Sequence, residues 1–434
     1  MRTLSAGCLP RAVWAGAATL AAPALRLLLR RRARRGKEIP ARLGERRGID
    51  ATPRPPGMLI WLHAASVGET VSILPVVERL AARAPRATLL LTTGTVTSAA
   101  LLARRLPELG LDQRVLHRFV PLDVPAWTRR FVAHWRPDLA CFVESELWPN
   151  LLAACRAAGV PTVLLNARLS ARSFAAWRRA PGLARALLGG FALVLARSAE
   201  DAARLAALGA TRIEAPGDLK FAAQPLPADP AELARLDAAL GARPRWLAAS
   251  LHPGEDEAAL AAHAALAGRF PGLVTVIVPR HPERGATIAA LAATAGLAVT
   301  RRAEGAAPPA GGIHVADTLG ELGLFYRLAG LAFIGGSLVP RGGQNPLEAA
   351  RLGCALAIGP HGENFTEAVA TLEAAGAIAR LPGAAALPGW LAPLLDDSPR
   401  RAALGEAARA VATRWAALPD QCAAALLALA RGAR

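Results

Sequence analysis

The chain has 434 residues, and 51 Lys plus Arg against 33 Asp plus Glu give it a formal net charge of +18. This length predicts two or three domains, and 53% hydrophobic with only 19% charged residues excludes a disordered chain. Only Lys37 and Lys220 are lysines, which leaves 49 arginines. Because the composition has drifted so far toward arginine, an arginine carries less functional information here, and each lysine carries more.

The sequence shows no pattern typical of a metal or disulfide framework. It has no CxxC, no HExxH, no P-loop and no Asp-x-Asp, so we expect neither a structural zinc site nor a metal clamp on a diphosphate. Widely spaced cysteines indicate reduced thiols in a cytosolic compartment. They are Cys8, Cys141, Cys155, Cys354 and Cys422.

The N-terminal segment combines an apolar run with a basic block. Residues 12–25 carry no charge, three leucines follow Arg26, and residues 30–37 read RRRARRGK. Positive charge after the apolar run is the reverse of a secretory signal, and it holds the following chain on the cytoplasmic side. Residues 26–54 contribute +8 of the net charge, which would be attracted to anionic lipid. We therefore expect residues 1–35 to form a membrane anchor or interfacial helix; an ordinary first helix with a solvated basic face is the alternative.

From residue 58 onward, short apolar runs alternate with helical stretches, which predicts an α/β chain with two doubly wound parallel sheets. A proline-rich segment, residues 216–230, reads as the connector. We expect domains at 36–222 and 223–405 and a C-terminal helix at 406–434. The expected strands are 58–63, 87–93, 139–145, 162–166 and 191–196 in the first domain, and 245–250, 273–279, 331–336 and 355–359 in the second.

Ligands of such sheets bind beyond the carboxyl ends of the strands, so we expect the site residues in the loops there. HAASVGE puts Ser66, Gly68 and Glu69 directly after a strand. Ser66-x-x-Glu69 fits a capping box, and Glu69 equally fits a carboxylate that takes a proton from a hydroxyl nucleophile. The spacing alone leaves both interpretations open.

Three further loops of the first domain carry polar side chains. TTGTVTS (92–98), with Thr93, offers hydroxyls and N–H groups to an anion, or is a turn with an N-cap. ESELWPN (144–150) brings Glu144 close to a second carboxylate, or is a solvated pair. Arg168 and Arg172 are four residues apart and share a helix face if that segment is helical.

The second domain repeats the pattern with different residues. Two His-Pro loops follow strands, one with Ser250 and His252 and the other with Arg280 and His281; they are candidate phosphate or base contacts, although a lone histidine is often structural. Gly335 and Gly336 allow a ligand close to the backbone.

The segment GGQNPLEAA predicts a helix start. Asn345 is placed as N-cap, Pro346 and Leu347 open the helix, and Glu348 lies in the first turn. Such a start binds phosphate through free N–H groups, and Glu348 would accept hydrogen bonds from ribose hydroxyls. A well-capped structural helix explains the same residues, but it does not explain the flanking glycines.

Together these segments resemble the 3-deoxy-D-manno-octulosonic acid (Kdo) transferases of lipopolysaccharide biosynthesis. The resemblance runs in order from about residue 42 to 366. The matching stretches are HAASVGE, TTGT-TS, P-D-P with RF--HW-PDL, ESELWPN, NARLS-RSF--W, GDLKF, S-HPGE, PRHPER, DT-GEL, FIGGS, GGQNPLEAA and GPH--NF.

The resemblance implies a GT-B fold, with two Rossmann-like domains and an active site between them. It implies an inverting glycosyltransferase at the cytoplasmic face of the inner membrane, which moves Kdo from CMP-Kdo to the lipid A precursor (lipid IVA). No metal or other cofactor is expected, since CMP-Kdo is itself the donor substrate.

The resemblance also implies roles for single residues. Glu69 would be the general base, and Glu144 and Lys220 would stabilise the transition state. Lys220 is the sharper inference, because the chain has almost no other lysine and we expect this one on the connector. We assign to the CMP-bearing donor Arg280, His281, Gly320, Glu321, Leu322, Asn345, Pro346, Leu347, Glu348, Ser250, His252, Gly335 and Gly336. We assign to the acceptor Ser66, Gly68, Thr93, Arg168 and Arg172.

Two alternatives remain open from the sequence: a GT-B enzyme that uses another nucleotide sugar, and a non-catalytic basic protein that binds membranes or nucleic acid. The aromatic residues amount to 5% and do not form a basic, stacking surface, so we expect an anionic membrane surface as partner and no nucleic acid. The sequence leaves open the oligomeric state, the acyl-chain requirement, the number of Kdo residues added, and whether residues 12–29 span the bilayer or lie in its interface.

Overall fold

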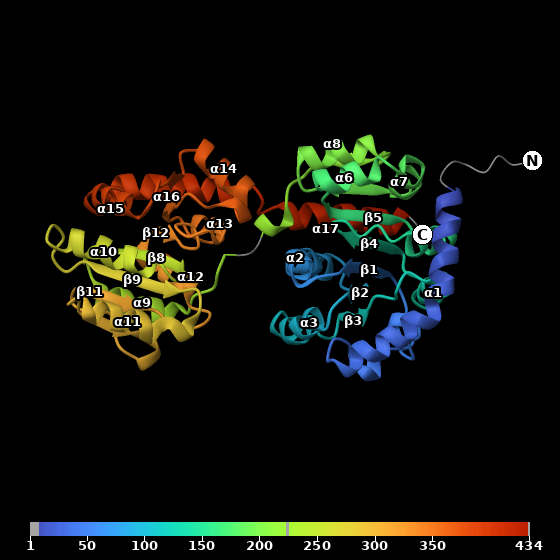
Figure 1. The fold of residues 1–434 in the computed structure, drawn as a ribbon, viewed down its shortest axis with the longest axis horizontal. Coiled ribbons are helices and arrows are strands. Elements are labelled where there is room, and N and C mark those ends of the chain that lie inside the picture. Colours follow the sequence, from blue (N-terminus) through green and yellow to red (C-terminus); the bar gives the residue numbers. More distant parts are fainter. Residues whose placement is uncertain (1–7, 223–224, 433–434) are drawn as a thin grey trace, which may run out of the picture. The chain divides into compact units, whose positions relative to one another are not determined.

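The computed structural model describes residues 8–222 and 225–432. The chain divides into two compact units: unit 1 is Met1–Ala223 with Trp415–Arg434, and unit 2 is Gln224–Arg414. The C-terminal helix thus returns to the N-terminal unit, as its colour in Figure 1 shows. The second division falls at 414/415, whereas the expected boundary at 405/406 lies inside a helix of unit 2.

Unit 1 is built on a seven-stranded sheet in the order β3-β2-β1-β4-β5-β6-β7, with every pair parallel. Its central strands are buried along their whole length, as expected of strands covered on both faces. The strands are β1 Leu59–Ala64, β2 Thr88–Thr93, β3 Val115–Phe119, β4 Leu139–Val143, β5 Thr162–Ala167, β6 Leu193–Ala196 and β7 Ile213–Glu214.

Helices cover both faces of this sheet. α2 (Val67–Arg83), α3 (Val96–Glu108) and α17 (Leu418–Gly432) pack on one face. α17 contributes buried residues every fourth position, Leu418, Cys422, Leu426 and Ala430, which is one apolar stripe of a helix. The opposite face is covered by α4 Pro125–Trp135, α5 Pro149–Ala157, α7 Pro181–Leu188 and α8 Ala199–Ala207. The remaining short helices are η1 Pro40–Arg42, η2 Glu45–Arg47, α6 Ala171–Trp177 and η3 Leu219–Ala222.

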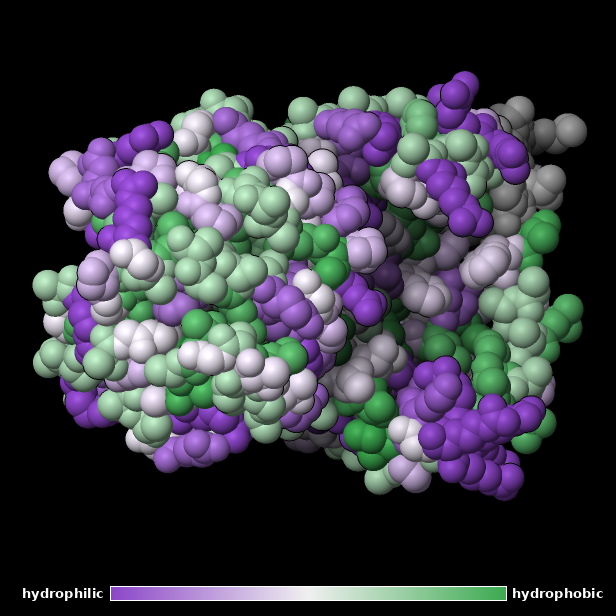
Figure 2. Space-filling view, turned by 60° about the vertical axis from the view of Figure 1, so that its left-hand side comes forward, coloured by the Kyte–Doolittle hydropathy of each residue, from purple (hydrophilic) through white to green (hydrophobic). Residues whose placement is uncertain are grey.

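The N-terminal helix α1 (Cys8–Arg34) lies along unit 1 and contacts α4, α5 and α7. Leu29 is buried on its inner side, while Val13, Leu20 and Leu27 are 65%, 85% and 69% exposed. Figure 2 shows apolar residues along this edge of the molecule beside a hydrophilic cluster. By length and composition, Ala12–Arg34 is the one described helical segment able to cross a membrane.

Unit 2 contains a second parallel sheet of seven strands, in the order β10-β11-β9-β8-β12-β13-β14. The strands are β8 Arg245–Leu251, β9 Val274–Pro279, β10 Val299–Arg301, β11 Gly312–Val315, β12 Leu331–Ile334, β13 Ala355–Ile358 and β14 Ile378–Arg380. One core joins this sheet to α10 (Asp256–Ala267), α11 (Gly285–Thr294) and α15 (Leu387–Asp396).

The other helices of unit 2 pack in pairs. α9 (Pro230–Leu240) contacts α12 (Leu322–Ala329), and α13 (Pro346–Arg351) contacts α16 (Ser398–Thr413). The remaining elements are η4 Pro282–Arg284, η5 Arg302–Glu304, η6 Glu363–Phe365, η7 Ala384–Ala386 and α14 Thr366–Ala374.

Two expectations about individual segments are corrected by the structure. Lys220 does not lie on a free connector, because η3 carries it and the neighbouring Leu219 and Ala222 belong to the core of unit 1. Arg168 and Arg172 do not share a helix, because α6 begins only at Ala171 and Arg168 precedes it.

Candidate active site

The strand order places a crevice at one point of each sheet. In unit 1 the order reverses between β1 and β4, and in unit 2 between β8 and β12. Loops leave such a pair of strands in opposite directions, which opens a crevice at their carboxyl ends. Ser66, Gly68 and Glu69 follow β1, Glu144 follows β4, His252 follows β8, and Gly335 and Gly336 follow β12. Many of the residues predicted from the sequence therefore lie at the two switch points.

Glu69 is held in the first turn of α2 by its own capping interactions. Its Oε1 accepts a hydrogen bond from Ser66 Oγ (2.8 Å), its Oε2 accepts one from the Ala65 N–H (2.7 Å), and its N–H donates to Ser66 Oγ (3.3 Å). Burial raises the pKa of Glu69, and the charges of Glu146 and Glu144 act in the same direction, against those hydrogen bonds. Glu69 therefore caps α2, and its raised pKa is also compatible with a general base.

Glu144 and Lys220 form an ion pair in unit 1. Lys220 Nζ lies 2.9 Å from Glu144 Oε1, with side chains 38% and 15% exposed. Glu144 follows β4 directly, and its N–H donates to the Leu165 carbonyl of β5 (2.9 Å). The sequence predicted both residues for the reaction but not that they contact one another.

A histidine and a second glutamate lie beneath this region. His63 is fully buried in β1, its Nδ1 lies 3.0 Å from Thr92 Oγ1, and its Nε2 lies 3.4 Å from Glu146 Oε2. Burial alone would raise the pKa of Glu146, but His63 and the Trp148 indole N–H together hold it below its usual value. Glu146 therefore adds a stable negative charge close to Glu69.

The predicted acceptor residues are not equally available. Ser66, Gly68, Arg168 and Arg172 are exposed, and a Cβ at Gly68 would meet open space. Thr93 is fully buried, and its hydroxyl lies 2.9 Å from His117 Nε2 of the neighbouring strand β3. The Thr93 hydroxyl thus contacts the neighbouring strand inside the sheet and is not exposed to an acceptor.

In unit 2 a buried carboxylate occupies the glycine loop. Glu255 is 1% exposed, and its Oε1 accepts hydrogen bonds from the N–H groups of Ser337 and Leu338 (2.9 Å each). Its Oε2 accepts from the N–H groups of Gly336 (2.6 Å) and His252 (2.9 Å). The Gly336 N–H already donates to Glu255. A ligand that approaches the two glycines would therefore find no free N–H group on Gly336.

His252 and His281 come together from adjacent strand ends. Their ring centroids are 6.1 Å apart in an edge-on arrangement, and His252 Nε2 lies 3.1 Å from Gln344 Nε2. Burial lowers the pKa of His252, and Arg341, His281 and Arg280 lower it further, against the charge of Glu255. A neutral His252 near exposed Arg280 and His281 suits recognition of a base and a phosphate.

The start of α13 has the geometry that the sequence predicted. Asn345 is the N-cap and accepts from the Leu347 N–H (3.1 Å), and Pro346 is the first helical residue. Asn345 Nδ2 donates to Glu348 Oε1 (3.3 Å). Burial raises the pKa of Glu348, against the hydrogen bond from Asn345 and the charges of Arg351 and Arg280.

Glu321 is engaged within unit 2. Arg302 Nη2 donates to Glu321 Oε1 (2.6 Å), and Thr318 Oγ1 also donates to this carboxylate. These contacts hold the pKa of Glu321 below its usual value. Gly320 precedes it with φ +86° and Leu322 opens α12, so the segment forms a turn fixed by Arg302.

Backbone strain gathers at these loops. Glu144, Asn166 and Ser250 have φ of +56°, +53° and +60°. Asn166 and Ser250 also lie at the irregular steps where β5 and β8 shift register against a neighbour. Left-handed non-glycine residues and bulges cost energy and concentrate near functional sites. Their placement supports the carboxyl ends of both sheets as the working surface.

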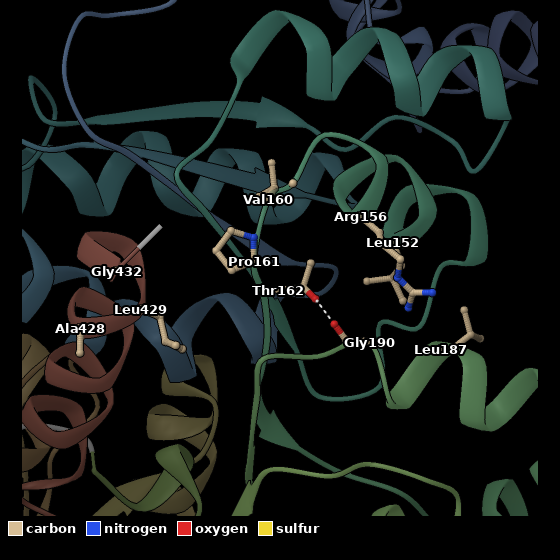
Figure 3. Close-up of a pocket in the computed structure, with 11 residues that line it drawn as sticks. Leu152, Arg156, Val160, Pro161, Thr162, Leu187, Gly190, Ala428, Leu429 and Gly432 are labelled. Atoms are coloured by element: carbon tan, nitrogen blue, oxygen red, sulfur yellow. Dashed lines mark hydrogen bonds between the residues drawn. The ribbon is translucent and has the colours of Figure 1, made fainter. Parts of the chain in front are cut away.

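A cavity of about 530 Å³ lies elsewhere, at the amino end of β5. It is lined by Leu152, Arg156, Val160, Thr162 and Leu429, among others (Figure 3). Figure 3 also shows the hydrogen bond from Thr162 Oγ1 to the Gly190 carbonyl (3.3 Å). None of the predicted site residues lines this cavity. We therefore do not identify it as the candidate active site.

Sequence reasoning missed His63, Asn166, Asp218 and Glu255 as members of the site. All four are buried polar residues, and each lies within one of the motifs quoted above. For His63 and Asn166, a polar side chain at the end of an apolar strand is the signal that could have found them. Among the described residues, no group of three or more His, Cys, Asp or Glu is placed to hold a metal ion.

Comparison with known proteins adds the following. Residues 38–223 match the family described as 3-deoxy-D-manno-octulosonic-acid transferase (kdotransferase). A 3-deoxy-D-manno-octulosonic acid transferase of Bordetella pertussis is 40% identical over 403 residues, which cover 90% of this chain and 92% of the relative. A probable mitochondrial 3-deoxy-D-manno-octulosonic acid transferase of Arabidopsis thaliana is 38% identical over 81% of this chain and 80% of its own length.

Among solved structures, a glycosyltransferase from Rickettsia africae matches with a TM-score of 0.56. The match covers 86% of this chain and 99% of that one, at 13% identity, so it bears on the fold alone. The expected GT-B kind of architecture, with two parallel-sheet α/β domains and an apolar N-terminal helix, is confirmed.

Proposed function

Because the chain belongs to the Kdo transferase family of glycosyltransferases, we propose that it moves Kdo from CMP-Kdo to the lipid A precursor (lipid IVA), with inversion at the anomeric carbon. Family membership decides against a non-catalytic basic binding protein. The observation that carries the finer proposal is the half-buried Glu69 at the switch point of unit 1, with a raised pKa and a fixed carboxylate.

Glu69 acts as the general base in this proposal. The acceptor hydroxyl gives its proton to Glu69 while its oxygen bonds to the anomeric carbon of Kdo. The bond from that carbon to the phosphate oxygen breaks, and its electron pair leaves with CMP. A base with a pKa raised toward the working pH is ionised enough to accept this proton and strong enough to hold it.

Lys220 and Glu144 stabilise charge in the same step. The Lys220 ammonium is one of only two in the chain, and its side chain is 38% exposed although its backbone lies in η3. A fixed cation of this kind favours the negative charge that develops as the glycosidic bond to phosphate breaks. CMP leaves as a phosphate monoester, so we propose that no metal is needed to bridge a diphosphate.

Unit 2 recognises the nucleotide. His252, His281 and Arg280 supply contacts for the base and the phosphate, and the capped start of α13 adds Asn345 and Glu348. Glu348, whose pKa is raised by burial, is placed to accept hydrogen bonds from ribose hydroxyls. The loop closest to the nucleotide contains Ser250, Gly335 and Gly336. The opposite side of the proposed nucleotide site is formed by Gly320, Glu321 and Leu322.

The charge and α1 support the proposed acceptor and location. The exposed leucines of α1 and the arginines after them suit a membrane that presents anionic lipid. We place the protein at the cytoplasmic face of the inner membrane, where a phosphorylated, acylated precursor is reached from the surface. Arg168 and Arg172 are exposed and are assigned to the phosphates of that precursor, with Ser66 and Gly68 beside its hydroxyl.

The test is a direct transfer assay with the full chain in lipid vesicles. Wild type, CMP-Kdo and the lipid A precursor should give a precursor heavier by Kdo in the mass spectrum and an equal amount of CMP. The reaction should persist in a chelator, and UDP-sugars should give no product. Transfer from a UDP-sugar but not from CMP-Kdo would overturn the donor, and loss of transfer in chelator would overturn the metal-free step.

A further inference from the structure

Asn166 occupies an unusual place at the end of β5. It is 2% exposed, its φ is +53°, and it stands at the step where β5 and β6 shift register between Leu165 and Ala167. Asparagine tolerates this left-handed conformation better than most residues. A buried amide must still find partners for both its oxygen and its nitrogen.

Both ends of the amide meet the segment that carries Lys220. Asn166 Nδ2 donates to Asp218 Oδ1 (3.0 Å), and the Leu219 N–H donates to Asn166 Oδ1 (2.9 Å). The same Asp218 oxygen accepts the Lys220 N–H (2.9 Å). Three consecutive residues of the chain are therefore tied, directly or through Asp218, to one side chain of β5.

Glu144, the other partner of the ion pair, is bound to the same strand. The Glu144 N–H donates to the carbonyl of Leu165 (2.9 Å), which is the residue before Asn166. Leu219 and Phe221, on either side of Lys220, are buried, while the Lys220 Nζ reaches 2.9 Å from Glu144 Oε1. Neighbouring residues of β5 thus fix both Glu144 and the backbone of Lys220.

We propose that Asn166 is a positioning residue that sets the Lys220 ammonium in place beside Glu144 through its two-sided hydrogen bond with Asp218 and Leu219. This inference rests on the proposed function, in which that ammonium acts on the leaving phosphate. Only an amide fits both partners, since aspartate would set a second carboxylate against Asp218, and an apolar side chain would leave the Leu219 N–H without its acceptor.

Misplacing a catalytic group by about 1 Å costs roughly 100-fold in rate. We therefore expect Asn166→Gly, which keeps the left-handed backbone but removes both hydrogen bonds, to lower kcat about 10- to 100-fold. Asn166→Asp keeps the acceptor for the Leu219 N–H but sets a second carboxylate against Asp218, and it should also lower kcat. The matched control is Thr162→Val, which removes a single hydrogen bond at the other end of β5 and should leave kcat unchanged.

The two lysines allow a test that does not depend on activity. In protein labelled with ¹³C at lysine Cε, the NMR spectrum contains one signal from Lys220 and one from Lys37, an exposed internal reference. The Lys220 signal should move in Asn166→Gly and Asn166→Asp and stay in place in Thr162→Val, while the Lys37 signal is constant. An unmoved Lys220 signal in both Asn166 variants, with the protein folded, would overturn the proposal.

A double-mutant cycle separates positioning from a general structural effect. If Asn166 acts through Lys220, Asn166→Gly should lower kcat no further in a Lys220→Ala background, and the KM values of the single variant should stay within roughly twofold. An equal loss of kcat in both backgrounds would overturn the proposal. If wild type transfers no Kdo, the proposed function fails, and the NMR signals still decide whether Asn166 positions Lys220.

Discussion

Glu255 offers the sharpest prediction about what holds the donor side together. The substitution Glu255→Gln keeps size and shape but makes one of the two oxygens an NH₂ group. Each carboxylate oxygen accepts two backbone N–H groups, Ser337 and Leu338 on Oε1 and Gly336 and His252 on Oε2. Whichever way the amide turns, two N–H groups, one buried and one half-buried, then face another donor.

The magnitude follows from that count. Each unsatisfied buried N–H costs about 1–3 kcal/mol, so the buried one should destabilise unit 2 by about 1–3 kcal/mol, and the half-buried one should add less. Since the free energy of unfolding of a domain is about 5–15 kcal/mol, this loss is a large share of the stability of unit 2. CMP binding should weaken as well, because the same carboxylate fixes the loops of His252 and Gly336.

The assay is urea unfolding followed by hydrogen exchange of peptides from unit 2, which separates its transition from that of unit 1. The control is Glu257→Gln, the same change two residues on at an exposed position, which should stay within about 0.5 kcal/mol of wild type. If Glu255→Gln unfolds at the same urea concentration as Glu257→Gln, the glycine loop does not depend on the buried carboxylate, and the reasoning is refuted.

Four further predictions concern Glu69, α1 and Lys220. Burial raises the pKa of folded Glu69, so its ionisation costs stability as pH rises; the free energy of unfolding of wild type relative to Glu69→Gln should therefore fall between about pH 4 and about pH 8 in a pH series of urea melts. For the same reason, wild-type kcat should fall as pH drops through that raised pKa, which a pH–rate profile measures. In vesicle flotation, Leu20→Glu with Leu27→Glu should reduce binding to anionic vesicles, whereas Leu319→Glu in unit 2, at a side chain 84% exposed, should not. Lys220→Arg keeps the charge but not the compact ammonium, and should lower kcat while CMP affinity, measured by calorimetry, is retained.

The sequence predicted the central strands well because both faces of each are covered. Strands β4 and β12 are unbroken apolar runs, β1 and β5 are apolar except for His63, Thr162 and Asn166, and all four are buried throughout. Of the five strands that it missed, β3, β7, β10 and β14 are the edges of the two sheets, and β11 is internal and buried but only four residues long. Three residues of β3 and all three of β10 are only half-buried, and β7 has two residues, so the apolar signal there is weak.

The site could be predicted as a set of loops but not as a set of contacts. A parallel α/β fold tells which ends of the strands carry ligands, and this was enough to select the loops of Glu69, Glu144 and His252. The partners of a side chain depend on the tertiary fold. Asn166 and Asp218 are 52 residues apart, and Glu255 and Ser337 are 82 apart, distances over which no local pattern reports.

The expectation about Lys220 shows the same limit. Prolines around residues 216–230 indicated a connector, yet Leu219 and Ala222 bury into unit 1. The buried neighbours hold the backbone of Lys220 in unit 1, whereas the sequence had placed this lysine on the connector. Thr93 is the converse case, since a hydroxyl in a loop-like motif turns out to be buried beside His117.

In the proposed mechanism, Glu69 takes the proton from the acceptor hydroxyl. The most direct measurement is single-turnover transfer of Kdo by Glu69→Gln, together with the affinity of this variant for CMP. We expect a rate about 100- to 10,000-fold below wild type, with CMP affinity unchanged because the proposed nucleotide contacts lie in unit 2. A Glu69→Gln enzyme that transfers Kdo at the wild-type rate, or that is folded but no longer binds CMP, would contradict it.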